Sequence, residues 1–208
     1  MTFSSVAAPI VAACLSILTL VPGAAFGQQV TPDDRDRIDA RIGQLSDHVS
    51  SGDIGATLDI IPPRLKAVLL DETGIVETDL KREMNQVWAN LLSEEGLTLV
   101  DFNLALDEAA ERVTPTGHRA YLTIPTETRL EIEDTGSFRI LTQTLAMEDE
   151  GDWYLIRMDK PEQTELLARA YPEFEGVAFP ASEIVVDQYQ ADEEPAPSPT
   201  PATGVSGP

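Results

Sequence analysis

The first half of the chain has the hydrophobic period of helices. Thr31-Pro32-Asp33-Asp34 predicts a helix start, because Thr31 can cap the helix, Pro32 fits its first turn and aspartates favour its positive end. Ser51-Gly52 predicts the end of this helix. A second helix is expected over Arg64–Leu70 and a third after Thr78, which gives a helical part over residues 31–95. The apolar stripe of the first helix consists of Ile38, Ile42, Leu45 and Val49.

After Gly96 the period changes to that of strands. Turn residues separate four alternating segments, and Pro161 begins a last helix over 161–170. The expected strands are Leu97–Leu106, His118–Glu133, Phe138–Glu148 and Asp152–Met158, forming a sheet over 97–158. The pattern therefore predicts an α+β domain over 28–186. In it, N-terminal helices pack on a curved, cone-like antiparallel sheet of four or more strands, with a short C-terminal helix.

Two-residue hairpin loops at Thr135-Gly136 and Glu150-Gly151 sort the strand residues into two faces. The predicted core face holds Leu130, Leu141, Leu145, Met147, Tyr154, Ile156 and Met158. The other face is mixed, with Trp153 and Leu155 as an exposed apolar spot among polar residues, and such spots often mark contacts. The candidate ligand or interface residues are therefore Trp153, Leu155, Arg157 and Ile140. The same face is the expected surface for a homodimer or an envelope protein partner.

The N-terminal segment predicts export. Val6 to Phe26 carries no charge, and Ala25-Phe26-Gly27 predicts a signal peptide over 1–27, cut after Gly27. This places the protein in the periplasm or outside a bacterial cell. An alternative is a lipoprotein anchored at Cys14, since Val11-Ala12-Ala13-Cys14 is similar to a lipobox. At the other end, residues 187–208 are rich in Pro, Ala, Ser and Thr and predict a disordered tail.

The charge balance excludes several partners. The chain has 14 Lys and Arg against 36 Asp and Glu, a formal net charge of −22. Nucleic acid would be repelled, and so would an anionic membrane surface unless Cys14 were lipidated. The acidity serves solubility or, alternatively, forms a cation store or a docking face for a basic partner. Because the single cysteine lies in the signal peptide, the mature chain has no disulfide or thiolate metal site.

The chain contains no recognisable catalytic motif, and no cofactor or metal is predicted. His48 and His118 fall in different elements without metal-ligand spacing, and no nucleophile elbow or phosphate loop is present. The acidic hairpin Glu148–Asp152 could attract calcium but lacks the ligand pattern of an EF-hand. Asp101 and Asp107 could supply a single buried carboxylate to a pocket.

The order of the predicted helices and strands is similar to that of a known fold superfamily. Three helices, a bent antiparallel sheet and a closing Gly151-Asp152-Trp153-Tyr154-Leu155-Ile156 strand resemble the nuclear transport factor 2-like superfamily, which includes SnoaL-like and ketosteroid isomerase-like proteins. The resemblance covers roughly residues 31–170. It implies helices on the concave side of the sheet, a pocket between them and dimers through the outer sheet face. No functional residue carries over.

Three functions remain open at this point. The first is a non-enzymatic envelope protein that binds a protein partner or a small ligand. The second is a small isomerase-like enzyme with a buried carboxylate in a cone-shaped pocket, whose catalytic residue is unknown. The third is a calcium-responsive envelope protein. A space between sheet and helices filled by apolar side chains favours binding, and a cavity holding a buried Asp, Glu or His favours the enzyme.

Overall fold

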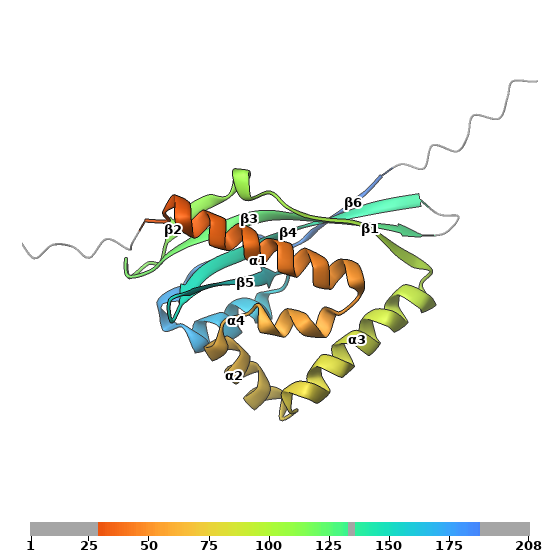
Figure 1. Cartoon of the computed structure of the whole chain (residues 1–208), viewed down its shortest axis with the longest axis horizontal. Coiled ribbons are helices and arrows are strands. Elements are labelled where there is room, and N and C mark those ends of the chain that lie inside the picture. Colours follow the sequence, from red (N-terminus) through yellow and green to blue (C-terminus); the bar gives the residue numbers. More distant parts are fainter. Residues whose placement is uncertain (1–28, 133–135, 188–208) are drawn as a thin grey trace, which may run out of the picture.

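The computed structural model describes residues 29–132 and 136–187 (Figure 1). The predicted signal peptide, Cys14 and positions 188–208 of the predicted tail lie outside the described residues. The helices are α1 (Pro32–Ser51), α2 (Pro63–Thr73), α3 (Glu77–Glu94) and α4 (Pro161–Ala170), with short 3-10 turns η1 (Ile54–Asp59), η2 (Leu106–Glu108) and η3 (Pro172–Phe174). The strands are β1 (Leu97–Leu104), β2 (Ala110–Val113), β3 (Ala120–Ile132), β4 (Gly136–Asp149), β5 (Asp152–Met158) and β6 (Glu183–Val186). The predicted α+β class is confirmed, and the predicted elements occur in the expected order, whereas β2 and β6 were not predicted.

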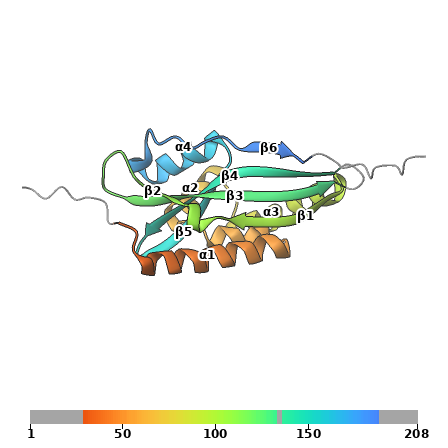
Figure 2. The ribbon, with the colours of Figure 1, turned by 90° about the horizontal axis from the view of Figure 1, so that it is seen from above.

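All six strands form one curled antiparallel sheet. Its order is β1-β3-β4-β5, with β2 paired to β3 and β6 paired to β4. Figure 2 shows three layers, in which α1 lies below the sheet and α4 and the C-terminal segment lie above it. Both faces of the sheet are therefore covered by other parts of the chain. Within the described ranges, no helix has the length and apolar character needed to cross a bilayer.

Local signals place the ends of α1 as predicted. The Thr31 hydroxyl accepts a hydrogen bond from the Asp34 backbone N–H at 3.2 Å, and the Asp34 carboxylate accepts one from the Thr31 N–H at 3.0 Å. This reciprocal pair is a capping box, which satisfies two N–H groups at the helix start. At the other end Gly52 has φ 77°, the left-handed conformation that glycine adopts without a Cβ penalty.

One predicted hairpin register is confirmed and the other is wrong. Met147 lies opposite Tyr154 on β5, as the turn at Glu150-Gly151 requires. The β3–β4 hairpin instead closes with Ile132 opposite Gly136, so Gly136 already belongs to β4 and the predicted loop at 135–136 is displaced. Leu130 consequently pairs with Phe138. The displacement is by an odd number of residues, which moves the β3 side chains to the other face relative to β4.

The face predicted to be mixed is a second core. Trp153 and Leu155 are only 4% and 2% exposed, so the exposed apolar spot expected there is wrong. Ile38 of α1 packs into the same cluster. The physical reason is the third layer, since α1 covers this face and α4 covers the opposite one. The cluster beneath α1 consists of Ile38, Ile60, Leu104, Leu122, Ile124, Ala146, Trp153 and Leu155.

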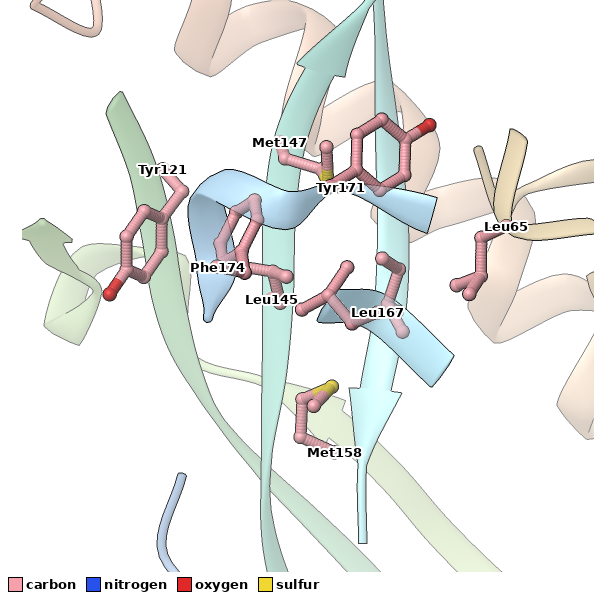
Figure 3. Close-up of a cluster of buried hydrophobic side chains, with 9 residues drawn as sticks. Leu65, Tyr121, Leu145, Met147, Met158, Leu167, Tyr171 and Phe174 are labelled. Carbon is pink, nitrogen blue, oxygen red and sulfur yellow. The ribbon is translucent and has the colours of Figure 1, made fainter. Parts of the chain in front are cut away.

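The opposite face carries the core that the sequence predicted in part. Leu145, Met147, Ile156 and Met158 are buried there, as expected. The C-terminal segment covers them beyond the predicted helix end at residue 170. Figure 3 shows Tyr171 and Phe174 of this segment together with Leu167 of α4, packed over the strands. The described domain therefore includes η3, which contributes the buried Phe174 to this core.

Candidate functional site

The four predicted interface residues do not form one surface. Trp153 and Leu155 are buried beneath α1, as described above. Arg157 is partly exposed, and its Nε donates to Asp159 Oδ1 at 2.7 Å. Ile140 is half-buried toward the other end of β4, where it lies opposite Thr128 of β3 and Ile184 of β6. The sheet twist and the helical layer thus separate residues that share one strand face.

A cavity of about 370 Å³ lies where the β4–β5 hairpin meets the start of α1, the start of α2, the beginning of β3 and η3. Its lining is mostly charged, with Trp153 as the aromatic wall. His118, one of the two histidines considered above, is exposed at this cavity. The other lining residues are Gln29, Asp34, Arg64, Arg119, Ala120, Glu148, Asp149, Glu150 and Glu173.

One of the acids that line the cavity, Asp149, is buried. The Asp149 side chain is 1% exposed, and its two oxygens have separate partners. Tyr171 Oη donates to Oδ2 at 2.8 Å, and Arg64 Nη2 lies 3.2 Å from Oδ1. Burial, reinforced by this hydrogen bond to Asp149, raises the pKa of the Tyr171 phenol well above its usual range. Tyr171 is therefore a fixed neutral donor to Asp149.

Two arginines enclose the ring of Tyr171. The guanidinium carbons of Arg64 and Arg119 lie 5.4 and 5.2 Å from its ring centroid, within the range of cation–π attraction. Arg119 Nε also donates to Glu173 Oε1 at 2.8 Å, and its Nη1 donates to the carbonyl oxygen of Glu148. These contacts tie α2, β3, the β4–β5 hairpin and η3 together. Both arginines at the cavity are thus held in place by acidic or carbonyl partners.

The opposite wall of the cavity is formed at the start of α1. Trp153 Nε1 donates to Asp34 Oδ1 at 2.9 Å. Hydrogen bonds from Thr31 and then from Trp153 lower the pKa of the Asp34 carboxyl below its usual value. The same carboxylate therefore caps α1 and orients the indole, which fixes this wall.

The charge balance of the cavity is negative. Five carboxylates line it against two guanidinium groups: Asp34, Glu148, Asp149, Glu150 and Glu173 against Arg64 and Arg119. Three of the carboxylates are ion-paired: Asp149 and Glu173 with these arginines, and Asp34 with Arg37 at 3.7 Å, which leaves Glu148 and Glu150. A negative potential therefore remains at the mouth of the cavity, which favours a cation. In the described part of the chain, no group of three His, Cys, Asp or Glu is arranged to hold a metal ion.

The other acids and the other histidine considered from the sequence lie elsewhere. Asp101 on β1 and Asp107 on η2 are exposed, so neither is the buried carboxylate expected for a pocket. His48 is in the last turn of α1, at the negative end of its dipole. The buried acid is Asp149. Sequence analysis considered it only as part of the acidic hairpin Glu148–Asp152.

No family model, curated protein or solved structure matches this chain.

Sequence reasoning missed the central residues of this site. Tyr171 and Arg119 are far from Asp149 along the chain, and Arg64 is farther still. No local spacing relates them, because their elements meet only after the sheet has folded. A weak signal was available in Tyr171, which directly follows the last predicted helix and precedes Pro172.

Proposed function

We propose that this chain is a non-enzymatic binding protein, and that its ligand is a small organic cation held in the cavity beside Trp153. The observation that carries this proposal is the excess of carboxylates at the cavity, where the two arginines are already engaged by Asp149 and Glu173. Glu148 and Glu150 are available to an ammonium or guanidinium group. Trp153 borders the same place but is almost completely buried, so the two carboxylates make the proposed contact with the ligand.

Binding is favoured over catalysis because both oxygens of the buried Asp149 are already engaged, one by Tyr171 and the other by Arg64. The Asp149 side chain is almost completely covered, and Tyr171, its hydrogen-bond donor, has no exposed surface. A general acid or base must lie within hydrogen-bond reach of the reacting group. The space between the sheet and the helices is also filled by two apolar clusters on its two faces. Both observations support the binding hypothesis over the cone-pocket enzyme.

The proposed setting is the bacterial envelope, which rests on the export signal predicted over 1–27. The relationship to the nuclear transport factor 2-like superfamily likewise remains a proposal, supported by the curled sheet preceded by helices. A dimer through the Trp153 face is disfavoured, because α1 covers that face.

Calorimetric titration of spermidine into the purified protein tests the cation site. We expect saturable binding that weakens with added salt, since screening reduces attraction between exposed charges. The double variant Glu148→Gln/Glu150→Gln should weaken binding by about tenfold, which corresponds to about 1.4 kcal/mol. Glu162→Gln is the matched control, because Glu162 is an exposed acid on α4 outside the cavity.

The location of binding is read from the indole N–H signals of the two tryptophans by NMR. Spermidine in the cavity should shift the signal of Trp153 and leave that of Trp88 in place, since Trp88 lies on α3. Equal weakening by Glu162→Gln, or equal shifts of both indoles, would mean a diffuse attraction to an acidic surface and would overturn the proposal.

A further inference from the structure

Helix α3 carries an apolar stripe that the described part of the chain leaves uncovered. None of its 18 residues is buried. Val76 at its N-cap, Val87 and Leu91 are 63%, 60% and 43% exposed, and Leu80 and Met84 lie between them at helical spacing. Helices in proteins gain most of their stability by burying such a face. Figure 1 shows α3 at the periphery, between the end of α2 and the start of β1.

The helix is nevertheless firmly anchored through a different face. A Cβ on Gly55 would lie 2.4 Å from the Lys81 carbonyl oxygen, so η1 and α3 are in direct backbone contact. Asn85 accepts a hydrogen bond from the Gly55 N–H at 2.6 Å and donates to Asp53 at 2.9 Å. The stripe is therefore exposed because α3 is held with this side outward.

Ion pairs strengthen the anchor. Lys81 Nζ lies 2.7 Å from Asp59 and 3.0 Å from Glu77, and Lys66 of α2 contacts the same two acids at 3.6 and 3.2 Å. The hydrogen bond to Lys81 is the largest cause that lowers the pKa of both Asp59 and Glu77. The network connects η1, α2 and α3 and holds the orientation of the stripe.

The outer border of the stripe is acidic. On a helix of 3.6 residues per turn, Glu83 and Glu94 fall on the side of the stripe away from the anchored face. Both residues are exposed, and no ion pair involves them within the described ranges. Lys81 faces the anchor, and Arg82 lies on the far side of the helix, where it donates to Asp79. The stripe is thus bordered by two carboxylates in a chain of net charge −22.

We propose that α3 is the docking site for a basic amphipathic helix of another protein. The apolar face of the partner covers Val87 and Leu91, and its lysines or arginines pair with Glu83 and Glu94. This is side-by-side packing of two amphipathic helices, with apolar side chains at helical spacing and flanking charges that set specificity and association rate. The site is separate from the cavity, whose lining contains no α3 residue.

Charge selects this occupant over two others. A second copy of the chain would bring Glu83 and Glu94 against an equally acidic surface, and like charges across an interface are unfavourable. An anionic lipid surface would meet the same repulsion. A cationic helix gains from both the apolar and the acidic part of the surface.

The test uses fluorescence anisotropy with a labelled 18-residue amphipathic helix of Leu and Lys as the probe. Two control probes have the same length: a Leu/Lys peptide in scrambled, non-amphipathic order and an amphipathic Leu/Glu peptide. We expect the amphipathic Leu/Lys probe to bind at least tenfold more tightly than either control probe. Equal affinity of the scrambled probe would mean attraction by charge alone and would refute the docking site.

Two variants of the protein locate the surface. Val87→Ser/Leu91→Ser should weaken probe binding by at least tenfold, and Glu83→Gln/Glu94→Gln should weaken it by several-fold and reduce its salt dependence. The matched control is Ile184→Ser/Val186→Ser on β6, where two apolar side chains are at least as exposed. We expect this control to bind like the parent chain.

If the β6 control loses probe binding as strongly as Val87→Ser/Leu91→Ser, the probe binds any exposed apolar surface. That result would overturn the proposal. Sedimentation of the protein alone supplies a further check. A dimer that the Val87→Ser/Leu91→Ser variant dissociates would make a second copy the occupant and refute the basic partner. Each variant is compared with the parent chain only when its melting curve matches that of the parent chain, so that a loss of binding does not reflect unfolding.

Discussion

The indole N–H of Trp153 donates a hydrogen bond to the Asp34 carboxylate at 2.9 Å, across 119 positions of the chain. Asp34 belongs to the capping box of α1, and Trp153 is the second residue of β5, beside the cavity. The Asp34 carboxylate thus joins the N-terminal turn of α1 to strand β5 of the sheet. Trp153 is buried because α1 packs over it, and the hydrogen bond to Asp34 satisfies its indole N–H there.

Asp34→Ala should lower the free energy of unfolding by about 1–3 kcal/mol, because the cap is lost and the buried indole N–H has no acceptor. Urea unfolding followed by circular dichroism measures the change. Asp33→Ala is the control, since Asp33 is an exposed residue of the same helical turn. Its cost should stay below about 1 kcal/mol, the usual range of a charge–dipole contribution. Similar costs for both variants would contradict the role of the Trp153 contact.

The stabilisation by Asp34 should depend on pH in a defined direction. Hydrogen bonds from Thr31 and Trp153 lower the pKa of Asp34 in the folded state below its unfolded value of about 4. The contribution is therefore complete above about pH 4 and is lost as the pH falls through the lowered pKa. The stability difference between the parent chain and Asp34→Ala, measured from pH 7 down to pH 2.5, should shrink only in the acid part. A constant difference would contradict this linkage.

Tyr171→Phe should destabilise the fold by about 1–3 kcal/mol, since the buried Asp149 carboxylate loses its donor and keeps only the contact with Arg64. Tyr154→Phe is the matched control. Tyr154 is half-buried, and its hydroxyl makes no hydrogen bond within the described ranges. Equal unfolding midpoints for the two variants in urea would show that the Tyr171 hydroxyl contributes nothing.

Alkaline pH should act on the same tyrosine. Burial and the bond to Asp149 raise the folded-state pKa of Tyr171 above the unfolded value of about 10. Its contribution is therefore complete below about pH 10 and is lost as the pH rises toward the folded-state pKa. Between pH 9 and 11 the stability of the parent chain should fall more steeply than that of Tyr171→Phe. Absorbance of tyrosinate at 295 nm should show one more delayed ionisation in the parent chain than in Tyr171→Phe, because burial also raises the pKa of Tyr121, which both proteins contain.

Alanine substitutions at two glycines should change the stability of the protein in opposite directions. Gly55→Ala would place a Cβ 2.4 Å from the Lys81 carbonyl oxygen, which forces η1 and α3 apart and should cost about 1–3 kcal/mol. Gly43, within α1, has no neighbour within 4 Å of an added Cβ. Gly43→Ala should therefore stabilise the protein by about 0.5–1 kcal/mol through helix propensity. Thermal unfolding measures both, and a neutral Gly55→Ala would contradict the close contact that orients α3.

The ends of elements and one hairpin could be predicted from the sequence because their causes are local. Thr31 and Asp34 form their capping box within one turn, and Glu150-Gly151 sets the β4–β5 register over a few residues. The β3–β4 hairpin was misplaced because Gly136, taken as a loop residue, is the first residue of β4. Alternation alone does not reveal such a displacement, since both registers place apolar residues on each face.

By itself the sequence determined the α+β class, the order of helices and strands and the strongly acidic character, all of which follow from local periodicity and composition. Only the tertiary structure decided that α1 covers Trp153, that Tyr171 lies between Arg64 and Arg119 over the buried Asp149, and that the α3 stripe faces outward. The physical reason is that a hydrophobic pattern indicates which face of a helix or strand is buried. Which other element covers that side depends on contacts between residues far apart in the chain, and those exist only once the layers have packed.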